Sequence, residues 1–148
     1  MMLIILDKDP VKSAQLLPDK IKFKQLIELC QLICSAGISN VYKPIKQGKH
    51  LQNWILKNPI WTKKFAIALY ELCKSINMSK STMKNIIDII SSIPYEISKD
   101  KEIETAIFRY SKDYECKIFT NTELPIEECI KQYKKYIEWK KKKNVKGY

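Results

Sequence analysis

The sequence predicts an all-α protein, a compact single-domain helical bundle of residues 1–148 with or without a short N-terminal extended arm. Three observations indicate this fold class. Apolar residues recur at the three- and four-residue spacing of helices along most of the chain. Only three glycines occur, and no hairpin turn of the Asn-Gly type is present. A length of 148 residues suits one hydrophobic core.

The first elements are predicted from capping and proline signals. The apolar run Met1–Leu6 is either a short strand or the N-terminal arm. Asp9 and Pro10 predict the start of a short helix, because Asp is a good N-cap and proline suits the first helical position. A longer helix is expected from about Asp19 to Cys34, with Gly37 as its stop. Its apolar face consists of Phe23, Leu26, Ile27, Cys30 and Ile33.

Two helices are expected in the middle of the chain. The first runs from about His50 to Lys57, and Asn58-Pro59 ends it. The second covers Trp61–Ile76, and its apolar spacing predicts which residues face inward. These residues are Trp61, Phe65, Leu69, Leu72 and Ile76.

The next helix is capped by Ser79 or Ser81 and ends at Pro94. Its inward residues are Met83, Ile86, Ile87 and Ile90. From Tyr95 to Asn121 the periodicity weakens, so this segment is expected to be irregular with one short helical piece.

The last helix is expected to begin at Pro125. Glu127 and Glu128 in its first turn, and lysines in its last turn, complement the helix dipole. A basic, frayed C-terminal tail is expected at about residues 140–148.

The charge balance indicates a polyanionic partner. The chain has 27 Lys+Arg against 16 Asp+Glu, a net charge of +11, whereas solubility alone needs only about 2–8 charges. Nucleic acid is favoured over an acidic protein or a membrane surface, and a solubilising lysine surface is the alternative. Arg109 is the only arginine, so contacts to the phosphates of double-stranded DNA are expected to dominate over bidentate reading of guanine.

The cysteines and the single histidine predict neither a metal site nor a cofactor. The number of cysteines is five, no CxxC pair occurs, and His50 has no histidine partner. Buried thiols suit an intracellular, reducing compartment, which would be the host cytoplasm or nucleus, or a virion. No run approaches the roughly 18 apolar residues of a membrane span.

A polar stripe follows the expected helix Asp19–Cys34. Lys20, Lys24, Glu28 and Gln31 lie three or four residues apart, next to the apolar face, where residues tend to border a groove. A carboxylate among basic groups stays ionised and can stabilise a developing cation. The alternative is an ordinary Lys24–Glu28 pair on a surface helix.

Two further segments suit phosphate binding. In "YKPIKQGKHLQNW" the lysines 43, 46 and 49 precede a helix start at His50, and a helix N-terminus behind a basic loop suits a phosphate. The chain end places Trp139 beside four lysines, and an aromatic side chain can stack on a base. The alternative for the lysine-rich loop is an ordinary exposed connector. The alternative for the chain end is a core-docked helix with a frayed basic tail. The DNA-binding candidates are Lys20, Lys24, Gln31, Lys43, Lys46, Lys49, Trp139, Lys140, Lys141, Lys142 and Lys143.

The order of several motifs resembles a set of small uncharacterised phage and large-DNA-virus proteins. The motifs are Leu6-Asp7, Asp9-Pro10, Asp19-Lys20, Lys24, Glu28, Gln31-Leu32, Tyr42-Lys43, His50, Trp54, Trp61, Tyr133, Tyr136 and Trp139. That set is distantly similar to pyrimidine-dimer DNA glycosylases of the endonuclease V type, which are single-domain helical proteins.

This distant resemblance implies a site and a mechanism. The family's catalytic glutamate falls on Glu28 and its histidine on His50, while Ile21 stands where the family has a second histidine. The family's nucleophile is the α-amino group exposed by methionine removal, which attacks C1′ and forms a Schiff base before β-elimination. The amine suits this role because its pKa lies near 8.

The chain begins Met1-Met2, and a bulky second residue usually blocks methionine removal. Four alternatives follow. Met1 itself supplies the amine, or methionine removal occurs nevertheless and exposes the amine of Met2. Otherwise a lysine such as Lys20 or Lys24 replaces the α-amine, or lyase chemistry is lost. The favoured reading is a DNA glycosylase, with or without AP-lyase activity, acting on a flipped damaged or modified base. The alternative is a non-catalytic viral DNA-binding protein for packaging, replication or transcription, with viral protein partners left open.

Overall fold

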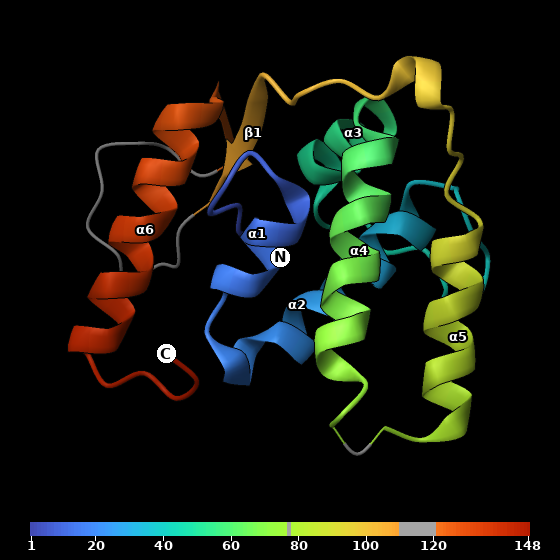
Figure 1. Cartoon of the computed structure of the whole chain (residues 1–148), viewed down its shortest axis with the longest axis horizontal. Helices are drawn as coiled ribbons and strands as arrows, with labels where there is room; N and C mark the ends of the chain where they lie inside the picture. Colours follow the sequence, from blue (N-terminus) through green and yellow to red (C-terminus); the bar gives the residue numbers. More distant parts are fainter. Residues whose placement is uncertain (77, 110–120) are drawn as a thin grey trace.

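The structure, a computed structural model, describes residues 1–76, 78–109 and 121–148. The elements are α1 Pro10–Leu16, α2 Asp19–Ser35, α3 Lys49–Lys57, α4 Pro59–Cys73, α5 Lys80–Ser91, the 3-10 helix η1 Ile97–Lys99, β1 Thr105–Phe108, β2 Thr122–Pro125 and α6 Ile126–Lys142. Figure 1 shows α4 and α5 at one side of the molecule, α6 at the other, and α1 and α2 between them. The fold is mostly helical, as predicted.

The predicted helix boundaries are confirmed where capping chemistry defines them. The Asp9 carboxylate accepts hydrogen bonds from the first turn of α1, and Pro10 is its first residue. Ser79 caps α5 through its hydroxyl. Gly37 has φ +87° after the end of α2, and its N–H donates to Cys34 O at 3.0 Å. A left-handed glycine at this position is the usual way in which a helix ends.

A two-stranded antiparallel sheet corrects the all-α prediction. β1 and β2 pair in the register Thr105↔Pro125 to Phe108↔Thr122. The segment expected to be irregular therefore contains β1, besides the short helical piece η1. Its residues 110–120 lie outside the described residues. Four residues are too few to show a period-2 pattern, and β2 carries a glutamate and a proline, which are uncommon in strands.

Three residues expected to face inward are exposed instead. Leu72, Ile76 and Ile87 keep 39%, 43% and 46% of their surface accessible. Ile76 lies beyond the end of α4 at Cys73, so helical periodicity no longer places it. The other predicted inward residues of α4 are buried as expected.

The N-terminal arm, Met1–Leu6, runs through the core without forming a strand. Leu3, Ile4, Ile5 and Leu6 are each at most 3% exposed. Because neighbouring side chains of an extended segment point to opposite sides, their joint burial means that protein covers both sides of the arm. The strand alternative is therefore wrong, and the arm alternative is confirmed.

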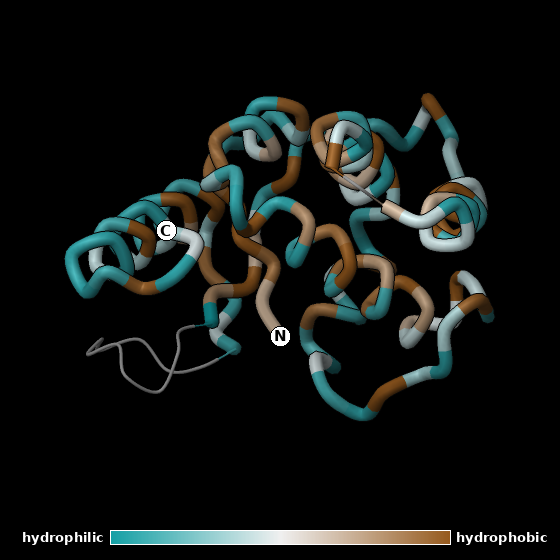
Figure 2. Tube along the Cα trace, turned by 90° about the horizontal axis from the view of Figure 1, so that it is seen from below, coloured by the Kyte–Doolittle hydropathy of each residue, from teal (hydrophilic) through white to brown (hydrophobic). Residues whose placement is uncertain are grey.

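α6 is attached to the rest of the fold through the sheet. The Tyr133 hydroxyl donates to Ile107 O at 2.8 Å, and the Tyr133 ring packs on Phe108 with centroids 4.9 Å apart. Figure 2 shows that the α6 coil, which lies beneath the C label, is mostly hydrophilic. One buried face therefore docks α6, and the rest of its surface meets solvent.

The chain turns back after α6 rather than fraying. Asn144 has φ +54°, and the Asn144 and Val145 N–H groups donate to Lys141 O and Lys140 O. Helices commonly end in such a turn, in which one residue after the helix adopts the left-handed conformation. The C-terminal segment, Val145–Tyr148, returns toward α2 (Figure 1), where Gly147 lies against Ile21. Among the described residues, no helix is long and apolar enough to cross a membrane.

Candidate functional site

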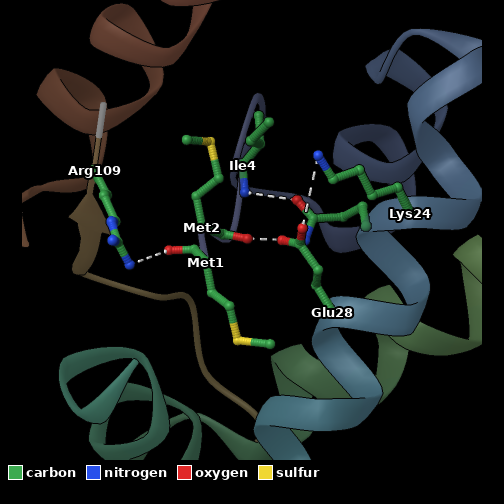
Figure 3. Close-up of polar contacts among 7 residues, drawn as sticks. Met1, Met2, Ile4, Lys24, Glu28 and Arg109 are labelled. Atoms are coloured by element: carbon green, nitrogen blue, oxygen red, sulfur yellow. Dashed lines mark hydrogen bonds and ion pairs between the residues drawn. The ribbon is translucent and has the colours of Figure 1, made fainter. Parts of the chain in front are cut away.

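The N-terminal arm is held by the side-chain amide of Gln25 on α2. Gln25 Oε1 accepts a hydrogen bond from Ile4 N at 2.9 Å, and its Nε2 donates to Met2 O at 3.0 Å. The Gln25 side chain is buried, so these bonds replace the partners that an extended segment would otherwise find in a sheet. Figure 3 shows the resulting path of the arm across α2. The bonds fix where Met1 lies.

Arg109 fixes the first residue from the opposite side. Its Nη1 donates to Met1 O at 3.0 Å, as Figure 3 shows. Arg109 directly follows β1, and its backbone N–H donates to the Tyr133 hydroxyl at 3.2 Å. The sheet and α6 therefore position the guanidinium that holds Met1.

Glu28 lies one turn after Lys24 on α2, and their side chains approach to 4.0 Å. The Glu28 side chain is 24% exposed, whereas that of Lys24 is 77% exposed. The carboxylate is thus partly withdrawn from water while the ammonium is not. An exposed pair at this separation contributes little to stability, about 0.3–0.5 kcal/mol.

Glu28 lines a pocket of about 520 Å³, called the Glu28 pocket below. Three parts of the chain form its walls. They are the arm (Met1, Met2, Ile4), α2 (Lys20, Ile21, Lys24, Gln25, Glu28), and α6 with the C-terminal segment (Tyr136, Lys140, Val145, Lys146, Gly147, Tyr148). Residues from both ends of the printed sequence thus meet at one site.

The electrostatics of the pocket act on the α-amino group of Met1. Burial lowers its pKa from 8.0, the Arg109 guanidinium lowers it further, and Lys24 adds to this effect, while the Glu28 carboxylate opposes it. The net lowering enlarges the neutral fraction of the amine at neutral pH. Burial also raises the pKa of Tyr148 to about 12, with smaller contributions from Tyr136 and Glu28.

The arrangement combines two groups useful for covalent catalysis at a sugar carbon. A neutral amine is a nucleophile, and desolvation or a neighbouring cation is a known way to obtain one near pH 7. A carboxylate within the same pocket can stabilise a developing cation and transfer protons.

The structure brings together part of the predicted site. Met1, Glu28, Lys20, Lys24 and Lys140 all line the Glu28 pocket. The other residue of the predicted α2 stripe has a different role: Gln31 Nε2 donates to Lys43 O at 2.7 Å and holds the loop before α3 against α2.

The predicted basic loop does not line the Glu28 pocket. Lys43, Lys46, Lys49 and His50 are exposed around the start of α3, outside the pocket walls. Gly48 alone comes near the arm, because a Cβ at that position would lie 3.9 Å from the Met1 sulfur. The structure therefore does not place His50 with Glu28.

The remaining candidates lie on or just after the last turn of α6. Trp139 is half-buried, and Lys141, Lys142 and Lys143 are exposed. Lys141 pairs with Glu138 at 3.5 Å. Of the predicted C-terminal lysines, Lys140 is the one that reaches the pocket.

Sequence reasoning did not include Gln25, Arg109, Lys146 or Tyr148 among the candidate site residues. A signal for Gln25 existed, since it lies four residues from both Ile21 and Leu29 and so interrupts an apolar stripe. Local spacing could not place Arg109 and Tyr148, because β1 brings Arg109 to Met1 and the chain reversal after α6 brings Tyr148 to the pocket.

The described residues contain no cluster of three or more His, Cys, Asp or Glu that could hold a metal ion. Four cysteines, namely Cys30, Cys34, Cys73 and Cys129, are buried free thiols; the fifth, Cys116, lies outside the described residues. Comparison of the chain with protein-family models, curated proteins and solved structures finds no match.

Proposed function

We propose that the protein is a DNA-binding repair enzyme, a DNA glycosylase that acts on a damaged or modified base flipped from the duplex, with or without AP-lyase activity. One observation carries the proposal. The Met1 amine, with its lowered pKa, and the Glu28 carboxylate share one pocket. A nucleophilic amine beside a carboxylate is the pair that Schiff-base chemistry at C1′ needs.

The charge of the pocket supports DNA as the partner. Lys20, Lys24, Lys140 and Lys146 line it, and Glu28 is the one acidic residue among its described walls. Together with the net charge of +11, these ammonium groups suit a phosphate backbone.

The proposed reaction uses the two groups in sequence. The neutral Met1 amine attacks C1′, the N-glycosidic bond breaks, and the base leaves with the bonding electrons and accepts a proton. The attacking nitrogen loses one proton, the C1′–O4′ bond then breaks as O4′ accepts a proton, and a protonated Schiff base forms. For lyase activity, a base removes a C2′ proton and the C3′–O bond breaks. Glu28 stabilises the cationic sugar and carries protons in these steps.

The chemistry requires a free amine at Met1, or at Met2 after methionine removal. Lys24 and Lys20 are the alternative amines, since both line the same pocket. Peptide mapping of a covalent adduct distinguishes these four residues, and an intact-mass measurement shows which residue begins the chain.

Borohydride trapping tests the proposal. The protein with its native N-terminus is mixed with duplexes that carry an abasic site or a cyclobutane pyrimidine dimer. We expect a covalent adduct on Met1 or Met2, and Glu28→Gln should slow its formation about 100-fold or more, as general acid–base and electrostatic contributions do. Glu138→Gln is the matched control, because Glu138 is an exposed glutamate of α6 that pairs with Lys141.

Two results would contradict the enzyme proposal. An adduct formed at an unchanged rate in Glu28→Gln would remove the carboxylate from the mechanism. Absence of both adduct and base release, with DNA binding retained, would favour the second candidate, a non-catalytic DNA-binding protein. The net charge of +11 supports that candidate, which predicts a salt-dependent affinity without sequence preference.

A further inference from the structure

The C-terminal segment is fitted closely onto α2. Gly147 has φ +98°, and a Cβ at that position would lie 3.0 Å from Ile21 Cγ2. A residue with a side chain would be strained there and would crowd α2. Glycine lets the backbone approach and so brings the next residue, Tyr148, to the wall of the Glu28 pocket.

Three aromatic rings surround the ammonium group of Lys140. Its Nζ lies 5.4 Å from the ring centroid of Tyr136, and 5.7 Å from those of Trp139 and Tyr148. Each distance is within the range of a cation–π interaction. The Tyr136 and Tyr148 rings also meet edge to face with centroids 6.5 Å apart. These contacts restrain Lys140 more than water restrains a freely extended lysine.

The wall formed by α6 and the C-terminal segment thus carries two kinds of group. Tyr148 supplies an aromatic ring, and Lys140 supplies a fixed ammonium group, and both face the same pocket as Glu28. An ammonium has three N–H donors, so contact with the rings leaves capacity for an anion. An aromatic ring beside a cation suits a ligand that is flat at one end and anionic at the other.

We propose that the Glu28 pocket binds one nucleotide extruded from DNA, with its base against the ring of Tyr148 and its phosphate on Lys140. This inference rests on the proposed function for the identity of the nucleic acid. It adds the two residues that would recognise the flipped nucleotide, one for its base and one for its phosphate.

Lys140 and Tyr148 are chosen over the neighbouring lysines and aromatic residues because Lys140 is restrained and Tyr148 lines the pocket. Lys20 and Lys146 also line the pocket but are exposed, so binding a phosphate would cost each of them side-chain freedom that Lys140 has already lost to its rings. Trp139 is aromatic but does not line the pocket, whereas Tyr148 does. Stacking on a tyrosine tolerates any base, so the site selects by how easily the base leaves the duplex.

The test compares two duplexes of the same sequence by fluorescence anisotropy. One is fully paired, and in the other a normal base lies opposite a tetrahydrofuran residue and so has no pairing partner. The tetrahydrofuran has no C1′ leaving group, so it forms no Schiff base. The second duplex is called the orphan-base duplex. The measured quantity, called the orphan-base preference, is the dissociation constant for the paired duplex divided by that for the orphan-base duplex.

We expect Tyr148→Ala to lower the orphan-base preference about 10-fold, since removal of one stacking ring typically weakens binding by roughly 5- to 100-fold. Tyr148→Phe keeps the ring and should keep the preference. Tyr95→Ala is the matched control, because Tyr95 is an exposed tyrosine that does not line the pocket. Lys140→Gln should weaken binding of the orphan-base duplex more than of the paired one, whereas Lys142→Gln should affect both alike.

Three results would overturn the inference. The orphan-base preference could be unchanged in Tyr148→Ala, it could fall as far in Tyr148→Phe as in Tyr148→Ala, or Lys140→Gln could weaken both duplexes equally. Binding is measured without chemistry, so the two proposals fail separately. A retained preference with neither a borohydride adduct nor base release would remove the catalytic proposal alone, and an adduct with no effect of Tyr148 would remove the nucleotide site alone.

Discussion

The buried amide of Gln25 gives the sharpest stability prediction. In Gln25→Ala, the Ile4 N–H and the Met2 carbonyl both lose their partner. The Ile4 N–H belongs to an arm residue that is 3% exposed, so leaving it unsatisfied costs about 1–3 kcal/mol. Met2 is half-buried and water can replace part of its bond, so its share is about 0.5–1.5 kcal/mol. The expected total is therefore about 1.5–4.5 kcal/mol.

Urea denaturation followed by tryptophan fluorescence measures this loss, and calorimetry gives the change in Tm. For a chain of this length, each kcal/mol lowers Tm by roughly 2–4 °C, so a decrease of roughly 3–18 °C is expected. Gln25→Leu retains most of the side-chain volume but neither hydrogen bond, and it should be nearly as destabilising as Gln25→Ala. This variant separates the destabilisation caused by the lost hydrogen bonds from that caused by the cavity that alanine leaves.

Gln132→Ala is the control, because Gln132 is a half-buried helical glutamine whose amide donates to Glu128 Oε1 one turn away at 2.8 Å. It should change the free energy of unfolding by no more than about 0.5 kcal/mol. Equal losses in Gln25→Ala and Gln132→Ala, or a near-normal stability of Gln25→Leu, would refute the reasoning that Gln25 holds the arm.

Three further predictions follow from single groups. Because the pKa of the Met1 amine is lowered from 8.0, the rate of borohydride adduct formation should rise with pH with a midpoint below pH 8; a midpoint at or above 8 would contradict this. Burial raises the pKa of Cys30 and Cys129 to about 12, so peptide mapping after iodoacetamide treatment at pH 8 should find both unmodified in the folded protein and modified in urea. In urea denaturation, Gly48→Ala should destabilise more than Gly37→Ala, because both have positive φ, but only at Gly48 does the new Cβ meet an α2 side chain, at 2.7 Å. Each strained residue costs about 1–2 kcal/mol and the clash at Gly48 about 1–3 kcal/mol more, so equal losses would show that the core yields there.

The helices were predictable because local chemistry specifies them. Asp9, Ser79 and Gly37 define helix ends through their own side chain or backbone, and these ends lie where the sequence places them. The sheet was not predictable in this way, since β1 is stabilised by pairing with residues that follow it by more than a dozen positions. Strand formation over four residues depends on such distant partners.

The candidate site was predictable to the extent that one helix carries it. The spacing of Lys20, Lys24 and Glu28 along α2 was enough to place them at one groove. The opposite wall depends on a reversal of the chain after α6, which brings Tyr148 back to α2. His50, in contrast, was linked to Glu28 by resemblance alone, and the structure keeps it outside the pocket walls.

The meeting of Met1 and Tyr148 at one pocket has a practical consequence for anyone who expresses this chain. A purification tag attached before Met1 would convert the amine into an amide, and one attached after Tyr148 would begin at the pocket wall. A conventional fusion at either end would therefore interfere with the Glu28 pocket. The same geometry concerns synthesis: the pocket needs Met1 and Tyr148 together, so it cannot close until the ribosome has made Tyr148.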